Sequence, residues 1–299
     1  MTLQQLKYVV TVAECGNITE AAKQLFVSQP TVTSAIHDLE KEMQIVIFVR
    51  TNKGVILSED GERFLGHARQ VLEQVDLIEG IYKNDVVSKP HFAVSCQHYS
   101  FAVNAFVDVI RRFDAYQYDF TIREEQTHEI IEDVTNLKSE LGVIYLSSKN
   151  TEVLSKMLKR NELEFTELFT ATPHVFICDS HPLAQKKSIT MDDLQDYPYL
   201  TYEQGEYNSQ YFSEEFVSTL DSRKNIRVRD RATLFNLIIG LNGYTVCSGV
   251  ISAELNGRNI ISKPLDVEEY MRIGIITRKG VVLSRYAREY IEALKAHCM

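Results

Sequence analysis

Residues 19–33 read TEAAKQLFVSQPTVT, and this stretch decides the fold of the amino-terminal region. Ala21 and Ala22 are small, so a second helix can approach the helix that carries them. Ser28 is a favourable N-cap for the next helix. Pro30 falls in the first turn of that helix, where its missing N–H costs nothing. The stretch therefore predicts two helices joined by a short turn.

The helix after Ser28 has an apolar side and a polar side. Val32, Ile36, Leu39 and Met43 repeat at spacings of four, three and four, which predicts a buried stripe. A glutamine side chain can pair with adenine and threonine methyls can touch thymine, so a polar end suits a recognition helix. The alternative is the solvated face of a three-helix bundle. The candidate DNA-binding residues here are Ser28, Gln29, Pro30, Thr31, Thr33 and Ser34.

The flanking segments favour DNA recognition. Residues 3–14 predict a preceding helix, and residues 45–49 and 55–57 predict two short strands around a turn. This hairpin is the expected wing. Arg50 and Lys53 lie at or beside its tip, where cations reach phosphate or the minor groove.

Residues 59–84 predict one long linker helix, which begins after the N-cap Ser58. A heptad seam runs along it, which predicts a coiled coil between two chains. The alternative is a helix packed on its own domain. The seam consists of Phe64, Ala68, Val71, Val75, Ile78 and Tyr82.

Residues 91–299 alternate between strand and helix patterns, which predicts an α/β fold. Helices are expected at 208–220 and 249–255, among others. Ligands in such folds lie at the carboxyl ends of strands, beside helix N-termini. The residues expected there are mostly neutral hydrogen-bonding groups, which suit a small polar metabolite such as an amino or carboxylic acid; singly, each reads equally as a helix cap or loop residue. The candidate effector-binding residues are Gln97, His98, Ser100, Thr127 and Tyr202.

Residues 1–65 resemble the DNA-binding domain of the LysR-type transcriptional regulators. The resemblance implies a winged helix-turn-helix (1–58), a dimerising linker helix (59–84), a hinge (85–90) and a two-lobed periplasmic-binding-protein-like effector domain. Lobe I would comprise 91–161 and 266–299, and lobe II 162–265. Ser34 departs from the family, whose members often carry arginine there. The matching stretches are LxxLxYxxxVAE at 3–14, TEAAKxL at 19–25, VSQPTVT at 27–33, IxxLE at 36–40 and IFxRxxKGVxLS at 47–58.

The charge balance bears on how DNA is bound. The chain carries a net charge of −9, and residues 1–58 hold five basic and five acidic residues. A neutral DNA-binding head makes few phosphate contacts. We therefore expect affinity to depend on two or more heads binding together, in a homodimer or homotetramer.

The remaining signals concern class and compartment. Five cysteines without a CxxC pair argue against disulfides and structural zinc, and favour a reducing cytoplasm. Cys96 and Cys247 lie near strand ends, so a redox switch stands as an alternative to two inert thiols. No signal peptide, membrane span or common catalytic motif is found. The sequence predicts a regulator that binds double-stranded DNA, with no cofactor, metal, membrane or enzymatic activity. The rival classes are an α/β enzyme and a stand-alone solute-binding protein.

Overall fold

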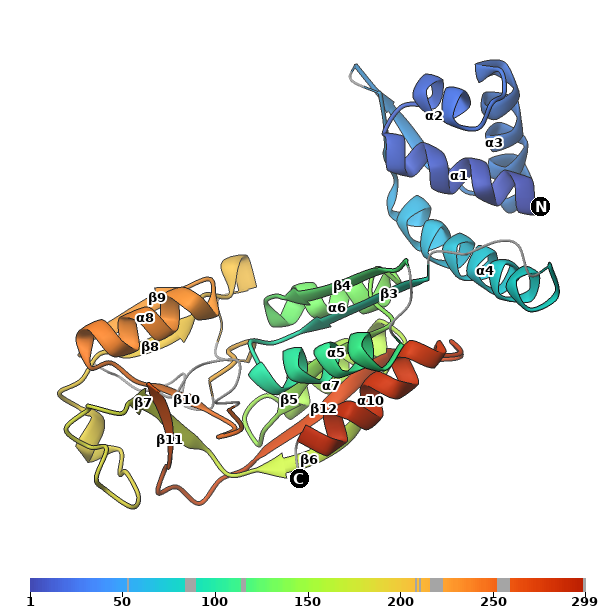
Figure 1. Cartoon of the computed structure of the whole chain (residues 1–299). Helices are drawn as coiled ribbons and strands as arrows, with labels where there is room; N and C mark the ends of the chain where they lie inside the picture. Colours follow the sequence, from blue (N-terminus) through green and yellow to red (C-terminus); the bar gives the residue numbers. More distant parts are fainter. Residues whose placement is uncertain are drawn as a thin grey trace. The chain divides into compact units, whose positions relative to one another are not determined.

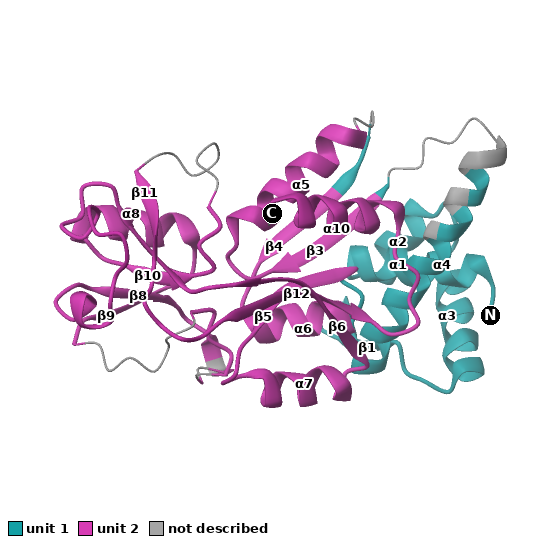
Figure 2. Cartoon of the chain, turned by 90° about the horizontal axis from the view of Figure 1, so that it is seen from below, with its two compact units in different colours: residues 1–90, 117–119, 136–138 teal, residues 91–116, 120–135, 139–299 magenta. Residues whose placement is uncertain are grey.

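The computed structural model describes residues 1–52, 54–83, 90–113, 117–207, 209, 211–215, 223–251 and 259–297. These residues form two compact units (Figure 1, Figure 2). Unit 1 comprises residues 1–90, 117–119 and 136–138, and unit 2 holds the rest. Lys53 and nearly all of the predicted hinge at 85–90 lie outside the described residues.

Three helices and a hairpin form the head, residues 1–58. The helices begin at capping residues: the Thr2 hydroxyl accepts from the Gln5 N–H, Asn17 accepts from two N–H groups, and Ser28 accepts from the Thr31 N–H. Gly16 ends the first helix in the left-handed region, with φ of 63°. The predicted winged helix-turn-helix is therefore confirmed. Its elements are α1 (Leu3–Cys15), α2 (Ile18–Gln24), α3 (Gln29–Met43), β1 (Phe48–Thr51) and β2 (Gly54–Leu57).

Backbone hydrogen bonds fasten the wing to the helices. The Val55 N–H donates to the carbonyl of Gly16, at 3.0 Å. The Glu40 carboxylate at the end of α3 accepts from the backbone N–H groups of Ile47 and Phe48, at 2.7 and 3.1 Å. The wing is thus held by the end of one helix and a carboxylate of another, and its position follows from the helical core.

The linker helix α4 spans Glu59–Lys83 and matches the prediction closely. Near its start, Leu65 packs into the core of the head and Ala68 is also buried. Further along the seam, the side chains of Val71 and Ile78 are 41% and 57% exposed. A single chain therefore buries the beginning of the heptad seam and leaves Val71 and Ile78 exposed to water.

Lobe I of unit 2 is built on a five-stranded sheet with helices on both faces (Figure 2). The strand order is β4-β3-β5-β12-β6, and β12 runs antiparallel to both of its neighbours. One face is covered by α5 (Ser100–Phe113) and α10 (Arg285–His297), the other by α6 (Thr127–Thr135) and α7 (Thr151–Arg160). The strands are β3 (His91–Cys96), β4 (Asp119–Glu124), β5 (Leu141–Leu146), β6 (Leu163–Ala171) and β12 (Met271–Arg278).

The predicted boundary between the lobes is wrong at one end. Residues 162–265 were expected to form lobe II, but β6 pairs with β12 from Leu163 to Ala171 and belongs to the sheet of lobe I. An ion pair between Arg272 and Glu167, at 2.7 Å, joins the same two strands. Lobe II therefore begins after Ala171.

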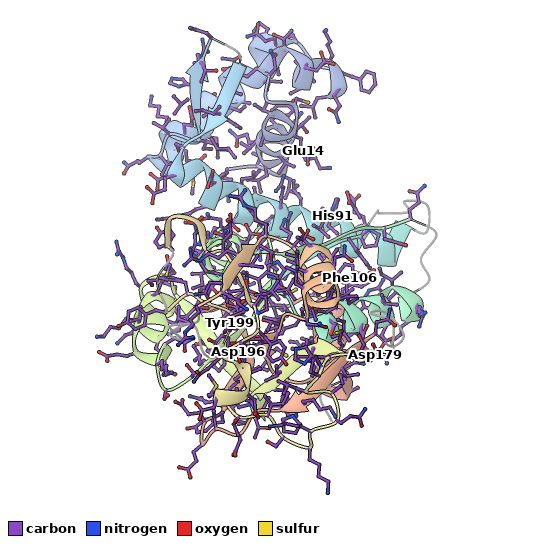
Figure 3. The ribbon with its side chains drawn as sticks, turned by 90° about the vertical axis from the view of Figure 1, so that its left-hand side faces the viewer. Glu14, His91, Phe106, Asp179, Asp196 and Tyr199 are labelled. Atoms are coloured by element: carbon purple, nitrogen blue, oxygen red, sulfur yellow. The ribbon has the colours of Figure 1, made fainter. Side chains whose placement is uncertain are left out.

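The described residues of lobe II form two small sheets and the helix α8. The sheets are β10-β7-β11 and the parallel pair β8-β9, joined by a bridge between Tyr199 and Tyr244. The rings of these two tyrosines stack with centroids 4.9 Å apart. Figure 3 labels Tyr199 here and Phe106 in lobe I, and both side chains are buried. The elements are β7 (His174–Cys178), η1 (Asp192–Leu194), β8 (Tyr199–Tyr202), η2 (Gly205–Tyr207), β9 (Asn225–Val228), α8 (Arg231–Leu241), β10 (Thr245–Cys247) and β11 (Ile260–Pro264).

Two predicted helices of lobe II are not found in the described residues. Residues 211–215 form a turn and a bend, so the helix expected at 208–220 is wrong there, and residues 216–220 lie outside the description. Residues 249–251 are also not helical, and the rest of the helix expected at 249–255 is outside the description. The turn at 211–215 matters for the site, because it carries two buried carboxylates.

Gly54 offers a test of how the wing is attached. Its φ is +139°, and an added Cβ would lie 2.3 Å from the carbonyl oxygen of Gly16. We expect Gly54→Ala to lower the free energy of unfolding of the head by roughly 1–3 kcal/mol, because the wing must move away from α1. Urea denaturation followed by circular dichroism measures this.

Gly240→Ala is the matched control. Gly240 lies in α8, and an added Cβ would meet nothing within 4 Å. This substitution should stabilise the chain by about 0.5–1 kcal/mol through helix propensity. A Gly54→Ala variant as stable as the Gly240→Ala variant would contradict the account of the wing.

Candidate functional site

The amino-terminal end of α3 forms an exposed polar surface. Gln29, Pro30, Thr31 and Ser34 are exposed, and Thr33 is half-buried beside them. The Ser28 and Thr31 hydroxyls lie 2.7 Å apart, and the Gln29 amide donates to the Thr33 hydroxyl at 3.3 Å. The opposite side of the helix is buried through Val32, Ile36 and Leu39. The predicted recognition residues thus share one accessible surface on a helix anchored by its apolar stripe.

Two residues near this surface extend the description. Arg50 is exposed on β1 of the wing, where the sequence placed it. Phe26 lies in the turn between α2 and α3 with φ of 55°, and its side chain is 96% exposed. The sequence indicated a turn at Phe26 but not an exposed ring beside the recognition helix.

The five candidate effector residues meet where lobes I and II face each other. Gln97 and Thr127 are fully buried, and the Gln97 amide donates to the Thr127 hydroxyl at 2.7 Å. The Thr127 hydroxyl in turn donates to the carbonyl of Phe212, at 2.8 Å. The Gln97 amide oxygen accepts from the Tyr145 N–H. These two side chains are therefore already bonded within the protein and hold the strand ends together.

The other three candidates line an enclosed space, and we call this region the interlobe cleft. The ring of His98 stacks on Tyr202 with centroids 3.8 Å apart and planes 8° from parallel. The Ser100 hydroxyl donates to the carbonyl of Val250 at 3.4 Å. All three border a cavity of about 30 Å³, together with Arg231, Thr245 and Ser248. That volume holds roughly two water molecules.

Two carboxylates that sequence reasoning missed occupy the cleft. Glu214 accepts from the His98 N–H at 2.8 Å and lies 2.9 Å from Nδ1 of the same residue. Glu215 accepts from the Tyr202 N–H at 2.6 Å and from the Ser213 hydroxyl at 2.8 Å. Both side chains are buried. The only signal in the sequence was two consecutive acidic residues, which are usually exposed.

The cleft is crowded with carboxyl groups, and their pKa values reflect it. Burial, followed by the nearby Glu214, raises the pKa of Glu215 to about 8. Burial also raises the pKa of Glu124, although Arg231 lies 2.8 Å away and opposes the rise. Burial and then Asp133 raise the pKa of Glu125 to about 7. For His98, burial acts to lower the pKa, but the Glu214 carboxylate outweighs it and the pKa rises.

A second, open cavity adjoins the first, and His98 borders both. Its volume is about 400 Å³. The ring of His128 lies against Tyr207 on its wall, with centroids 4.4 Å apart. Acidic side chains dominate the lining, which consists of His98, Glu124, Glu125, Gln126, His128, Glu129, Glu203, Gly205, Tyr207 and Arg229.

The cysteines give no support to a redox switch. Burial raises the pKa of both Cys96 and Cys247, so neither thiol is poised to ionise. Within the described residues, no group of three or more His, Cys, Asp or Glu side chains is arranged to hold a metal ion. Among the described helices, none combines the length and apolarity needed to cross a bilayer.

Comparison with known proteins gives matches along nearly the whole chain. The family model described as bacterial regulatory helix-turn-helix protein, lysR family, matches residues 3–62, and the LysR substrate binding domain matches residues 96–299. The DNA-binding transcriptional dual regulator OxyR of Escherichia coli K12 is 22% identical, over 99% of this chain and 95% of its own. The HTH-type transcriptional regulator YvbU of Bacillus subtilis is 26% identical, over 99% and 98%.

Solved structures show the same fold. A full-length OxyR variant from Pseudomonas aeruginosa superposes with a TM-score of 0.65 at 21% identity, covering 99% of this chain and 95% of its own. The LysR family transcriptional regulator CbnR superposes with a TM-score of 0.55 at 19% identity, and each chain is covered completely. The whole chain, from head to lobe II, therefore has the architecture of these regulators.

The raised pKa of Glu215 predicts a dependence of stability on pH. A carboxyl group whose pKa is higher in the folded chain than in the unfolded chain destabilises the folded chain as it ionises. This loss of stability develops as pH rises from the ordinary pKa of a glutamate to the folded pKa of about 8. Glu215→Gln mimics the protonated form. Between pH 6 and pH 8 the wild type should lose about 2 kcal/mol of unfolding free energy relative to this variant. Urea denaturation at the two pH values measures the difference.

Glu167→Gln serves as the control for this prediction. A hydrogen bond from Arg272 lowers the pKa of Glu167, so this carboxylate stays ionised above pH 6. The difference between Glu167→Gln and wild type should therefore be constant over the range. If Glu215→Gln behaved in the same way, Glu215 would be ionised throughout and the cleft less crowded than described.

Proposed function

Because the chain belongs to the LysR family of bacterial regulatory helix-turn-helix proteins, we propose that it controls transcription by reading an operator with α3. The observation that carries this function is the exposed surface of Gln29, Pro30 and Thr31 on a helix whose other side is buried. The N-terminal end of a recognition helix reaches base edges in the major groove, and its free N–H groups favour phosphate.

Operator binding by this head requires more than one copy. The five basic and five acidic residues of 1–58 give little general attraction to DNA. A dimer places two heads on one operator. Once the first head is bound, the second binds at a high effective concentration, so the pair binds more tightly than a single head. The exposed Val71 and Ile78 on α4 are the surface proposed for pairing. An imperfect inverted repeat is the operator that fits such a pair.

The second half of the proposal concerns the interlobe cleft. We expect a small polar metabolite to bind between lobes I and II and to change the arrangement of the heads rather than to be converted. An effector acts in this way only if it binds one arrangement better than another. We place this regulator in the cytoplasm and assign it no enzymatic activity, since the relatives are transcriptional regulators.

Some relatives are hydrogen peroxide-inducible genes activators, but peroxide sensing is not proposed for this chain. A sensor of that kind needs an accessible cysteine that ionises readily. Cys96 is buried, and burial raises its pKa and that of Cys247. Cys96 and Cys247 therefore lack the environment that peroxide chemistry requires.

Gln29→Ala tests base recognition. The substitution should weaken binding to an operator selected from random DNA by roughly 1–3 kcal/mol, which is the cost of losing one bidentate base contact. Binding to scrambled DNA should stay the same, because Gln29 adds no charge. Gel-shift titrations with both DNAs measure the ratio.

Gln4→Ala is the control, since Gln4 lies on α1 and its amide donates to the Tyr8 hydroxyl. That variant should keep the full ratio between operator and scrambled DNA. Equal ratios for Gln29→Ala and Gln4→Ala would rule out base readout by Gln29.

Val71→Asp tests the seam of α4. Val71 is 41% exposed in the single chain, so an aspartate costs little in the monomer but places a charge in the dimer interface. We expect light scattering to find monomers and gel shifts to find at least a tenfold loss of operator affinity, since one head then binds alone. Gln74→Asp, an exposed position off the seam, should leave the oligomer intact. A full-size oligomer in Val71→Asp would contradict the pairing surface.

A further inference from the structure

The cleft contains a carboxylate of the chain itself in the place where a ligand would be held. Glu214 belongs to lobe II, and its side chain is only 4% exposed. A carboxylate is almost never buried to this extent unless it is paired. Its partner is His98 of lobe I, whose side chain is 5% exposed. This buried ionic contact therefore ties the two lobes together, beside the ion pair between Arg231 of lobe II and Glu124 of lobe I at 2.8 Å.

Three hydrogen-bond donors converge on this carboxylate. The His98 N–H donates to it at 2.8 Å, Nδ1 of His98 lies 2.9 Å from it, and the Gln204 amide donates at 3.2 Å. The second ring nitrogen of His98 lies 3.2 Å from the carbonyl oxygen of Arg229. A carboxylate and a carbonyl both only accept, so with Glu214 ionised the ring between them donates from both nitrogens as an imidazolium. This set of donors is built to hold a carboxylate.

The neighbouring Glu215 shows what is particular to Glu214. The carboxylate of Glu215 is bonded to Tyr202 and Ser213, which both belong to lobe II. Those bonds persist whether the lobes approach or separate. The bonds from His98 to Glu214 exist only when lobe II lies against lobe I.

The volumes of the two cavities show why Glu214 and a ligand exclude each other. The enclosed space beside Glu214 is about 30 Å³, which is too small for a metabolite. The adjoining cavity of about 400 Å³ is large enough, and His98 borders both spaces. A ligand in the larger cavity reaches the donors of His98 only if the Glu214 carboxylate leaves them.

We propose that Glu214 is an internal ligand that closes the interlobe cleft, and that the effector is a monocarboxylate that displaces it from His98 and Gln204. This rests on the proposed function, which places an effector in the same cleft. The exchange replaces one carboxylate by another, so the buried imidazolium keeps a counter-charge while Glu214 returns to water. The effector binds only to molecules in which Glu214 has left His98. Its apparent affinity is therefore its intrinsic affinity multiplied by the fraction of those molecules.

The rest of the effector is constrained by the larger cavity. Glu124, Glu125 and Glu203 line it. Arg229 of the lining pairs with Glu203, but the acidic side chains outnumber it, so a second carboxylate on the ligand would lie among like charges and be repelled. The part of the effector beyond its carboxylate is therefore neutral or cationic, which selects monocarboxylates and amino acids over dicarboxylates.

The test removes the internal ligand and supplies a free one. In full-length Glu214→Ala the donors of His98 and Gln204 are vacant, so sodium acetate should bind and raise the melting temperature saturably, by roughly 2–4 °C. The wild type should need at least tenfold more acetate for the same shift. Sodium chloride and methylammonium chloride at equal ionic strength should have no such effect on the variant.

Glu203→Ala is the matched control. Glu203 belongs to the same cleft, and its carboxylate pairs with Arg229 rather than with His98. Acetate should not stabilise this variant beyond the wild type. Equal acetate shifts in Glu214→Ala, Glu203→Ala and wild type would overturn the proposal.

A second readout covers the case in which Glu214→Ala does not fold. In Glu214→Gln the neutral amide fills the same space, so the pKa of His98 measured by NMR should fall below that of the wild type. An unchanged value would overturn the pairing. Neither readout uses DNA, so a failure here leaves the operator experiments standing, and a failure of operator binding leaves the acetate result standing.

Discussion

The position of β12 as an interior strand of the lobe I sheet is the constraint on which unit 2 depends. This strand lies between β5 and β6 and runs antiparallel to both, so the sheet is complete only after the chain has left it and returned. Everything between Ala171 and Met271 must then be an insertion joined to lobe I by two connections. Such an arrangement leaves the two lobes free to differ in separation, and it creates the cleft between them. The hydrogen bond between Glu214 and His98 joins segments that the sheets do not hold together, so it helps to keep the two lobes in contact.

The cleft keeps several carboxyl groups in a confined space at a cost in stability. Glu215 and Glu125 have pKa values raised to about 8 and about 7 because burial disfavours their charged forms. Arg231 and His98 offset part of this cost, Arg231 by its contact with Glu124 and His98 by its contact with Glu214. A buried pair of this kind is destabilising when one partner is lost. An incoming group that replaces Glu214 must therefore bring its own negative charge, and this restricts ligands more strongly than the shape of the cavity does.

The sequence predicted the parts of the fold that local signals determine. Ser28 as an N-cap and the apolar stripe from Val32 to Leu39 each act within a few residues, so the head was predicted correctly. The partner of β6 depends on a strand more than one hundred residues later, and the lobe boundary was therefore wrong. The candidate residues His98 and Tyr202 follow strand ends in different sheets, and they meet because the strand ends of both lobes face the cleft. Glu214 and Glu215 were missed, since their burial arises from contacts across lobes and within a turn where the pattern favoured a helix.

The neutral head and the closable cleft fit one mode of regulation. When each head binds DNA weakly, the affinity of an oligomer depends steeply on whether two heads reach their half-sites together. An effector then needs only a small preference for one arrangement, because coupling free energies of about 1–3 kcal/mol change occupancy many-fold. Exchange of one carboxylate for another at His98 fits a coupling free energy of this size. The exchange replaces hydrogen bonds by others of the same kind, and it changes mainly the contact between the lobes. In the function proposed here, specificity for DNA lies in α3, whereas the response to the effector lies in the balance between Glu214 and its competitor.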